Sequence, residues 1–243
     1  LKRFKDAINV LELVCRISPL NQGYWTLLST AYKGNGSEEK YLALCSYKDF
    51  VHVGPLLQNR NETIELINEL NKFLNGLHNS HKHPIGQSLR NGSQTFENLL
   101  DDEHDLIKIL KAVLTDKAKS FITSLPKQRK HPFLSRIHSD LKFVGSWSVR
   151  LRQAGFHKSH YHSAGWLSGV LYVDVPAEVK ENGNGWLVFG RPDINGLDML
   201  EDFAVKPVAG NVALFPSYMW HGTNPICSDS QRLTVAFDIV PNS

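Results

Sequence analysis

From about residue 140 to its end, the chain is made of short runs rich in Val, Leu, Phe, Tyr and Trp, separated by Gly, Pro and Asn. Such runs predict β-strands bounded by turns, because branched and aromatic side chains favour extended backbone and the separating residues favour turns. The candidate strands are 143–152, 166–175, 185–190, 202–206, 211–215 and 232–240. Strands at this spacing are typical of a β-sandwich, jelly roll or barrel.

The residues ahead of this region show helical periodicity instead. The first 50 residues are expected to be helical, and apolar residues form one stripe along 63–78 and another along 104–125, which Pro126 ends. We therefore predict an α+β fold in three segments. Residues 1–58 form a helical segment, 59–139 a helical support with a polar loop, and 140–243 the β-structured core.

The first segment has the spacing of a tetratricopeptide repeat, a helical hairpin of about 34 residues. The residues at matching positions are Ala7, Leu11, Pro19, Trp25, Leu28 and Tyr32. Such repeats need neighbours to bury their faces, so a single remnant is expected to pack on the following domain or to bind a protein partner. An ordinary helical hairpin is the alternative.

Composition narrows the class of protein. Hydrophobic residues make up 42% and charged residues 21% of the chain, as in soluble globular proteins. The net charge is only +3, without a basic stripe, so nucleic acid is not an expected partner. No apolar run approaches the roughly 20 residues of a membrane span. The three cysteines are far apart, without a CxxC pair, which favours the reducing cytoplasm. No dinucleotide-binding, P-loop or nucleophile-elbow motif is present.

Three histidines in the β region have the spacing of a metal site. His160 and His162 stand two residues apart ahead of an apolar strand, so in extended chain both imidazoles point to one side. His221 follows another strand and could complete one face of a metal ion. Three protein ligands on one face of Fe(II) leave three positions for a bidentate 2-oxo acid and O₂.

Eleven residues after His221, the last strand begins with Arg232 and continues to Thr234 on the same side. A 2-oxo acid such as 2-oxoglutarate carries a distal carboxylate, which a guanidinium can bind through two hydrogen bonds. Arg232 is therefore the predicted anchor of that carboxylate, with the Thr234 hydroxyl as a second donor. The histidine pair, His221 and the Arg232–Thr234 pair are each weak evidence alone. Their order along the β region together favours a metal site with a 2-oxo acid.

From Trp147 onward the chain resembles the 2-oxoglutarate/Fe(II) oxygenases of the prolyl-hydroxylase-like superfamily, in particular a tetratricopeptide-linked bacterial and phage branch with HxH...H. The matching residues are Trp147, Gly155, His160 to His162, Ser168 to Val170, Tyr172, Gly185 to Pro192, Gly210 to Pro216, His221 and Arg232. The resemblance implies a double-stranded β-helix and a dioxygenase that uses Fe(II), 2-oxoglutarate and O₂ and releases succinate and CO₂. The substrate, a small molecule or a protein side chain, is not implied.

Further residues are weaker candidates for the site. His157 stands where close relatives tend to carry Asn and could contact the cosubstrate or the metal. Tyr172 could donate its phenol hydrogen bond to 2-oxoglutarate. Trp166 and Arg150 are candidate substrate contacts, although a core and an outer face are their commoner positions.

The polar stretch 87–95 shows neither helical nor strand periodicity, and we expect it to line the site. Its candidate substrate contacts are Gln87 and Arg90.

Two alternatives remain open. His162 could turn away and a carboxylate, Asp174 or Asp238, could take its place as a ligand. The protein could also be a three-histidine cupin-type dioxygenase without a 2-oxo acid, or a non-catalytic metal-binding interaction module. Hydroxylation is the expected reaction, because a histidine fills the ligand position that a halide would need.

Overall fold

Helices precede the β-structured core, as the sequence predicts. The computed structural model describes residues 3–78, 88–96, 98–180, 183–227, 229 and 231–242. Its α-helices are α1 (Phe4–Ile17), α2 (Gln22–Gly34), α3 (Glu38–Cys45), α4 (Tyr47–Phe50), α5 (Arg60–Leu77) and α6 (Asp105–Ser124). Short 3₁₀ turns are η1 (Leu99–Asp101), η2 (Leu134–Arg136) and η3 (Ala177–Lys180). The predicted helices at 63–78 and 104–125 are thus confirmed as α5 and α6.

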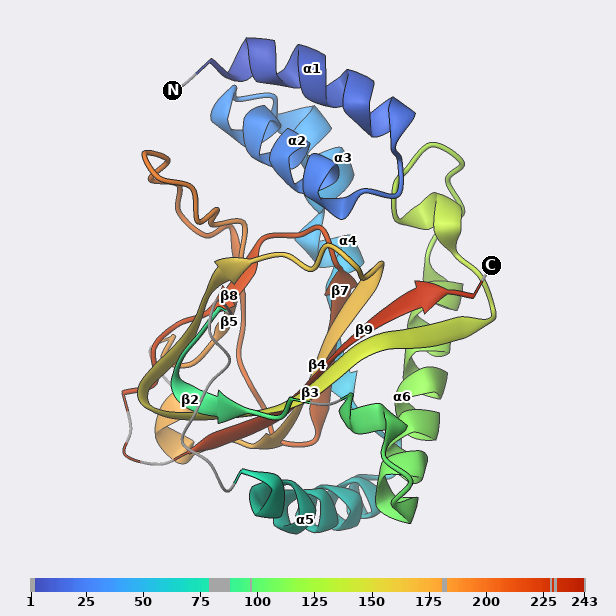
Figure 1. Cartoon of the computed structure of the whole chain (residues 1–243), viewed down its shortest axis with the longest axis vertical. Coiled ribbons are helices and arrows are strands. Elements are labelled where there is room, and N and C mark those ends of the chain that lie inside the picture. Colours follow the sequence, from blue (N-terminus) through green and yellow to red (C-terminus); the bar gives the residue numbers. More distant parts are fainter. Residues whose placement is uncertain are drawn as a thin grey trace.

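The strands form one strongly curved antiparallel sheet. They are β1 (His52–Pro55), β2 (Leu89–Gln94), β3 (Leu141–His160), β4 (Leu167–Asp174), β5 (Leu187–Phe189), β6 (Phe203–Val205), β7 (Asn211–Pro216), β8 (His221–Thr223) and β9 (Arg232–Pro241). Within the described residues their order is β1-β7-β4-β9-β3-β8-β5-β6, and β2 pairs with β3 as well. This nearly closed sheet is the jelly roll, or double-stranded β-helix, that the sequence predicts (Figure 1).

Strand β3 joins the two layers of the jelly roll. Its first part pairs with β9, and its last part pairs with β8 along the same edge. The strand turns between these parts, where Ala154 has a positive φ of 56°. At Gly155 a Cβ would come within 2.6 Å of the carbonyl oxygens of Arg152 and Asn91, so the turn requires glycine. The turn carries the end of β3, with His160, into the second layer.

The helices lie at two opposite ends of the sheet and along one of its sides (Figure 1). Figure 1 shows α1, α2 and α3 grouped at one end, α5 at the opposite end and α6 along one side. Helix α2 is bonded to the turn between β7 and β8, where the Thr26 hydroxyl donates to the Tyr218 carbonyl (2.7 Å) and the Trp220 indole donates to Thr30 (2.8 Å). Lys33 of α2 forms an ion pair with Asp202 (2.7 Å). The helices are therefore part of the structure that holds His221.

Three strands were not predicted. Strand β2 falls in the polar stretch 87–95, which lacks strand periodicity, and it nevertheless pairs with β3 through a register shift between Arg90 and Gly92. Strands β1 and β8 are too short for a hydrophobic pattern. Because β1 pairs with β7, the predicted helical segment 1–58 also contributes to the sheet. Among the described residues, every helix is too short or too polar for a membrane span.

Candidate active site

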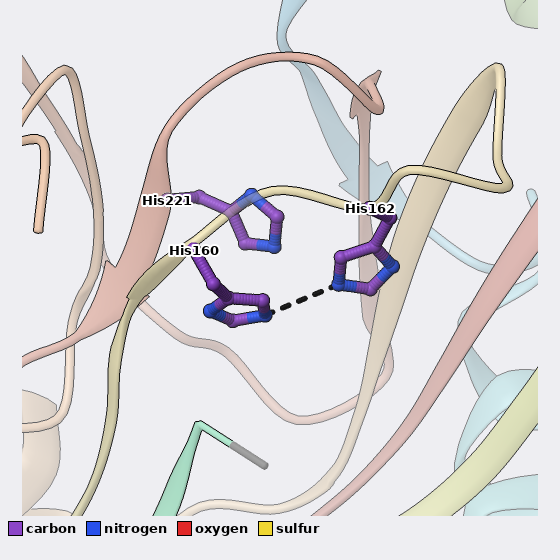
Figure 2. A group of neighbouring side chains, drawn as sticks. All are labelled: His160, His162 and His221. Atoms are coloured by element: carbon purple, nitrogen blue, oxygen red, sulfur yellow. Dashed lines mark hydrogen bonds between the residues drawn. The ribbon is translucent and has the colours of Figure 1, made fainter. Parts of the chain in front are cut away.

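Three histidines converge at the mouth of the jelly roll. His160 ends β3, His221 begins β8, and the two residues are register partners in the sheet. His162 follows β3, held by the hydrogen bond from its amide to the Ser217 carbonyl (3.0 Å). One ligand atom from each imidazole lies within 4.8 Å of the others, and Figure 2 shows the three rings turned toward one another. The structure thus brings together the three residues predicted to hold the metal.

Hydrogen bonds orient each imidazole in the same way. The Nδ1–H of His160 donates to the Lys158 carbonyl (2.7 Å), and that of His221 donates to the Met219 carbonyl (2.9 Å). A carbonyl oxygen can only accept, so both rings carry their proton on Nδ1. Their Nε2 lone pairs are therefore free for a metal ion, the arrangement that ligating histidines usually adopt.

His162 presents the same nitrogen. Its Nδ1 lies 2.6 Å from a carboxylate oxygen of Asp238, which can only accept when ionised. Its Nε2 then carries a lone pair and faces the Nε2 of His160 at 3.1 Å. Two lone pairs at this distance repel each other unless a cation lies between them. This contact, drawn as a dashed line in Figure 2, indicates that the site is built for a metal ion.

Burial keeps two of these imidazoles neutral. It lowers the pKa of His160 to about 4, with His162 nearby adding to the effect. It holds the pKa of His221 well below its usual value, helped by the other two imidazoles. Since a ligating histidine must be deprotonated, these shifts favour metal binding at neutral pH.

The Asp238 carboxylate lies between His162 and a pair of serines. It accepts a hydrogen bond from the Ser168 hydroxyl (2.6 Å), which is 2.8 Å from the Ser217 hydroxyl. Asp238 and Ser168 are register partners on β9 and β4. The alternative in which Asp238 replaces His162 is not what the structure shows, because His162 points into the group and Asp238 lies behind it. Asp174 is not among the residues that line the cavity.

A cavity of about 490 Å³ opens beside the histidines. Alternation along β9 directs Arg232, Thr234 and Asp238 into it, and alternation along β4 directs Ser168 and Tyr172 into it. The shared face of Tyr172 and Ser168 is the one that the sequence predicts. The metal-site histidines and the predicted cosubstrate anchor therefore line one cavity.

Arg232 is a buried cation in the wall of this cavity, with 3% of its surface exposed. Its guanidinium donates to the Gly185 carbonyl and to the Thr223 hydroxyl (3.4 Å), and none of the ion pairs among the described residues involves it. Its Nε and the Tyr172 hydroxyl are both buried without a hydrogen-bond partner in the described part of the chain. A buried cation and unpaired buried donors cost free energy unless a ligand satisfies them. They fit the distal carboxylate of 2-oxoglutarate.

Tyr172 stays protonated and able to donate. Burial raises the pKa of its phenol to about 12, although Arg232 beside it acts in the opposite direction. The guanidinium carbon lies 5.9 Å from the centre of the Tyr172 ring. Thr234, the register partner of Tyr172, donates to the Val149 carbonyl at the long distance of 3.4 Å.

His157 lines the cavity but is not part of the metal-ligating group. Its Nδ1 lies 3.0 Å from the Ser88 hydroxyl, and its ring centre is 5.9 Å from that of His160. The idea that His157 competes as a ligand is therefore not supported by its position, whereas contact with a cosubstrate remains compatible with it.

The weaker substrate candidates lie elsewhere. Trp166 is a core residue, 1% exposed, whose indole donates to the Phe133 carbonyl (3.0 Å), so it is not a stacking platform. Arg150 lies outside the cavity lining and donates to the His78 carbonyl (2.5 Å), because alternation on β3 turns it to the other face. Arg90 is likewise absent from the cavity lining. Gln87 lies outside the described residues.

The expectation that the polar stretch 87–95 lines the site is met by residues other than those named as candidates. Ser88 and Gln94 line the cavity, one at each end of β2. Trp147 and Tyr161 also line it and were not predicted to. Trp147 could have been found from strand alternation, since it lies on the same face of β3 as Val149.

Comparison with known proteins agrees with this geometry. Residues 145–238 match a family model described as "Putative 2OG-Fe(II) oxygenase". No curated protein sequence matches the chain significantly.

Solved structures of similar fold include a prolyl-4-hydroxylase of Pseudomonas putida (TM-score 0.53, 14% identity, covering 82% of this chain and 96% of that one). A prolyl hydroxylase of Trichoplax adhaerens in complex with a peptide fragment of hypoxia inducible factor is also similar (TM-score 0.54, 13% identity, covering 86% and 92%). A third is HygX of Streptomyces hygroscopicus with nickel and 2-oxoglutarate bound (TM-score 0.53, 11% identity, covering 81% and 85%). At these identities the likeness shows the fold.

Proposed function

We propose that residues 145–238, which match the family model of the 2OG-Fe(II) oxygenases, form an oxygenase domain that hydroxylates a C–H bond of its substrate through Fe(II) held by His160, His162 and His221. Fe(II), 2-oxoglutarate and O₂ are the reactants of an enzyme of this family. The products expected beside the hydroxylated substrate are succinate and CO₂.

One observation supports the proposal above the others: the three-histidine group and an unpaired buried guanidinium line the same cavity. The histidines would hold the metal through their Nε2 atoms, and bound iron supplies the O₂ chemistry that protein side chains cannot. Arg232 and Tyr172 would bind the distal carboxylate of 2-oxoglutarate and so orient the cosubstrate. The apolar walls of the cavity, including Val170 and Phe215, exclude water from the reacting groups.

Arg232 also argues against the cupin-type alternative, in which no 2-oxo acid is needed. A buried cation without a carboxylate partner among the described residues would then have no ligand to balance it. A purely structural metal site is disfavoured as well. Saturated sites have a fourth protein ligand, and the group found among the described residues contains three.

The substrate class is proposed only broadly. Beyond the metal and cosubstrate residues and the apolar walls, the cavity lining includes the polar and aromatic side chains of Gln94, Trp147 and Tyr161. Such a lining suits a small molecule or a protein side chain. The tetratricopeptide-like helices α1 and α2 are a proposed contact for a protein partner, and the reducing cytoplasm is the proposed compartment, since the three cysteines are free.

The experiment that tests the function measures succinate from 2-oxoglutarate by purified protein with Fe(II) and O₂, in which slow turnover without substrate is expected. His160→Ala and His221→Ala should abolish it. The matched control is His138→Ala, which removes a histidine outside the cavity lining and should leave turnover unchanged. Turnover that survives in both ligand variants would reject the proposed site.

A further inference from the structure

The Asp238 carboxylate is almost completely buried, and its surroundings in the described structure hold no fixed cation. Its side chain is 6% exposed, and its one basic neighbour within ion-pair distance among the described residues is the His162 imidazole, which is charged only when both ring nitrogens are protonated. Its other hydrogen bond comes from the neutral Ser168 hydroxyl. A buried carboxylate is costly unless an opposite charge balances it. The nearest place for that charge is the metal site on the other side of the His162 ring.

The geometry of the pair couples Asp238 to that site. Both carboxylate oxygens lie close to the same nitrogen, His162 Nδ1, at 2.7 and 2.6 Å. His162 therefore has its proton fixed on the side away from the metal, and its Nε2 lone pair is directed to His160 and His221. The other two histidines receive the same orientation from neutral backbone carbonyls. His162 differs from them in having an anion as its partner.

The anionic partner of His162 matters for the charge of the metal site. Three neutral imidazoles leave Fe(II) with its full double positive charge, whereas a carboxylate ligand would lower that charge by one. A carboxylate behind an imidazole raises the basicity of the ring and places its negative charge one ring away from the metal. In this cavity, the distal carboxylate of 2-oxoglutarate would balance Arg232, and Asp238 would add its negative charge to the metal site through His162.

We propose that Asp238 is the positioning residue of His162 and that, through this imidazole, it supplies the metal site with the negative charge that a carboxylate ligand would otherwise provide. The inference rests on the proposed three-histidine site and deepens it. Ser168 and, through it, Ser217 hold the carboxylate in place. The sequence left open whether His162 or a carboxylate such as Asp238 completes the site. In this proposal His162 is the ligand and Asp238 supplies the negative charge.

The test begins with Co(II) binding to the full-length metal-free protein, measured by calorimetry. Asp238→Asn keeps the shape of the side chain and removes its charge, so Co(II) affinity should fall about 10- to 100-fold. The matched control is Asp174→Asn, which removes a carboxylate at the far end of β4 that does not line the cavity, and affinity should not change. Ser168→Ala keeps the carboxylate and should have a smaller effect than Asp238→Asn.

Two further readouts separate a charge effect from a purely structural role. In the iron-loaded protein, Asp238→Asn should raise the Fe(III)/Fe(II) midpoint potential, because removal of a nearby negative charge favours the lower oxidation state. A structural role alone would lower the unfolding midpoint without moving the potential. Nitrogen NMR of the ¹⁵N-histidine-labelled, Zn(II)-loaded parent should show His162 protonated at Nδ1. This measurement needs no variant, so it tests the orientation of His162 even when Asp238→Asn does not fold.

His162→Ala distinguishes failure of the inference from failure of the proposed site. Weak Co(II) binding by His162→Ala together with normal affinity and potential in Asp238→Asn would overturn the inference alone. Normal binding by His162→Ala together with weak binding by Asp238→Asn would make Asp238 the ligand and overturn both. A His162 ring without a proton on Nδ1 in the parent would also overturn the inference.

Discussion

Replacement of Arg232 by alanine should selectively abolish tight binding of 2-oxoglutarate. The guanidinium is 3% exposed, so the ion pair that it would form with the distal carboxylate is shielded from solvent. Loss of one partner of such a pair costs about 3–5 kcal/mol. At about 1.4 kcal/mol per tenfold change, cosubstrate affinity should fall by at least about a hundredfold. Metal affinity should change little, because Arg232 is not in the ligating group.

The assay is calorimetric titration of 2-oxoglutarate into Co(II)-loaded protein without O₂, preceded by a Co(II) titration of the same variant. Arg150→Ala is the matched control, since Arg150 lies on β3 opposite Leu233, the neighbour of Arg232, yet points away from the cavity. It should bind 2-oxoglutarate as the parent does. An Arg232→Ala variant that is folded, binds Co(II) and keeps the parent's affinity for 2-oxoglutarate would refute the assigned role.

Three further variants test the fold and its pH dependence. Burial and the nearby Arg150 lower the pKa of His78 to about 4 from 6.5, so the stability that its neutral form contributes is present above pH 6.5 and is lost as the pH falls toward 4. Urea unfolding between these pH values should show a loss that is up to about 3 kcal/mol larger in the parent than in His78→Gln, and equal losses would contradict this. Gly155→Ala should lower the free energy of unfolding by about 1–3 kcal/mol, because its Cβ would clash with two carbonyl oxygens. Gly76→Ala in α5 has open space around it and should instead raise stability by about 0.5–1 kcal/mol; a similar change in both glycine variants would refute the steric explanation.

Much of the fold could be predicted, because its longer elements carry strong patterns. The apolar stripes of 63–78 and 104–125 and the β-rich runs after residue 140 correspond to α5, α6 and six of the strands in the described structure. Strand β2 was missed because Arg90, Asn91 and Gly92 lack the alternation of a half-buried strand and lie at a register shift. The pairing of β2 with β3 stabilises extended backbone in a segment whose side chains show no hydrophobic alternation.

The grouping of His160 with His162 could be predicted from local spacing, because residues two apart in extended chain share one face, and His221 and Arg232 could be proposed from their order along the β region. The contact between His162 and Asp238 could not, since it joins residues 76 positions apart through the pairing of β9 with β4 and the loop after β3. The substrate candidates Trp166 and Arg150 take the positions named as commoner for them, in the core and on an outer face. The sequence does not say which face of a strand borders the cavity, so an aromatic or cationic residue on either face is a candidate substrate contact. Neither Trp166 nor Arg150 lines the cavity.

The central claim is that three histidines, without a carboxylate ligand, hold Fe(II) in a cavity in which Arg232 binds the distal carboxylate of 2-oxoglutarate. A crystal structure of the protein, loaded anaerobically with Fe(II) and 2-oxoglutarate, tests it most directly. We expect the Nε2 atoms of His160, His162 and His221 on the metal, Asp238 hydrogen-bonded to His162, and the distal carboxylate of 2-oxoglutarate on Arg232. A carboxylate oxygen of Asp238 on the metal in place of His162, or a cosubstrate that does not contact Arg232, would contradict the claim.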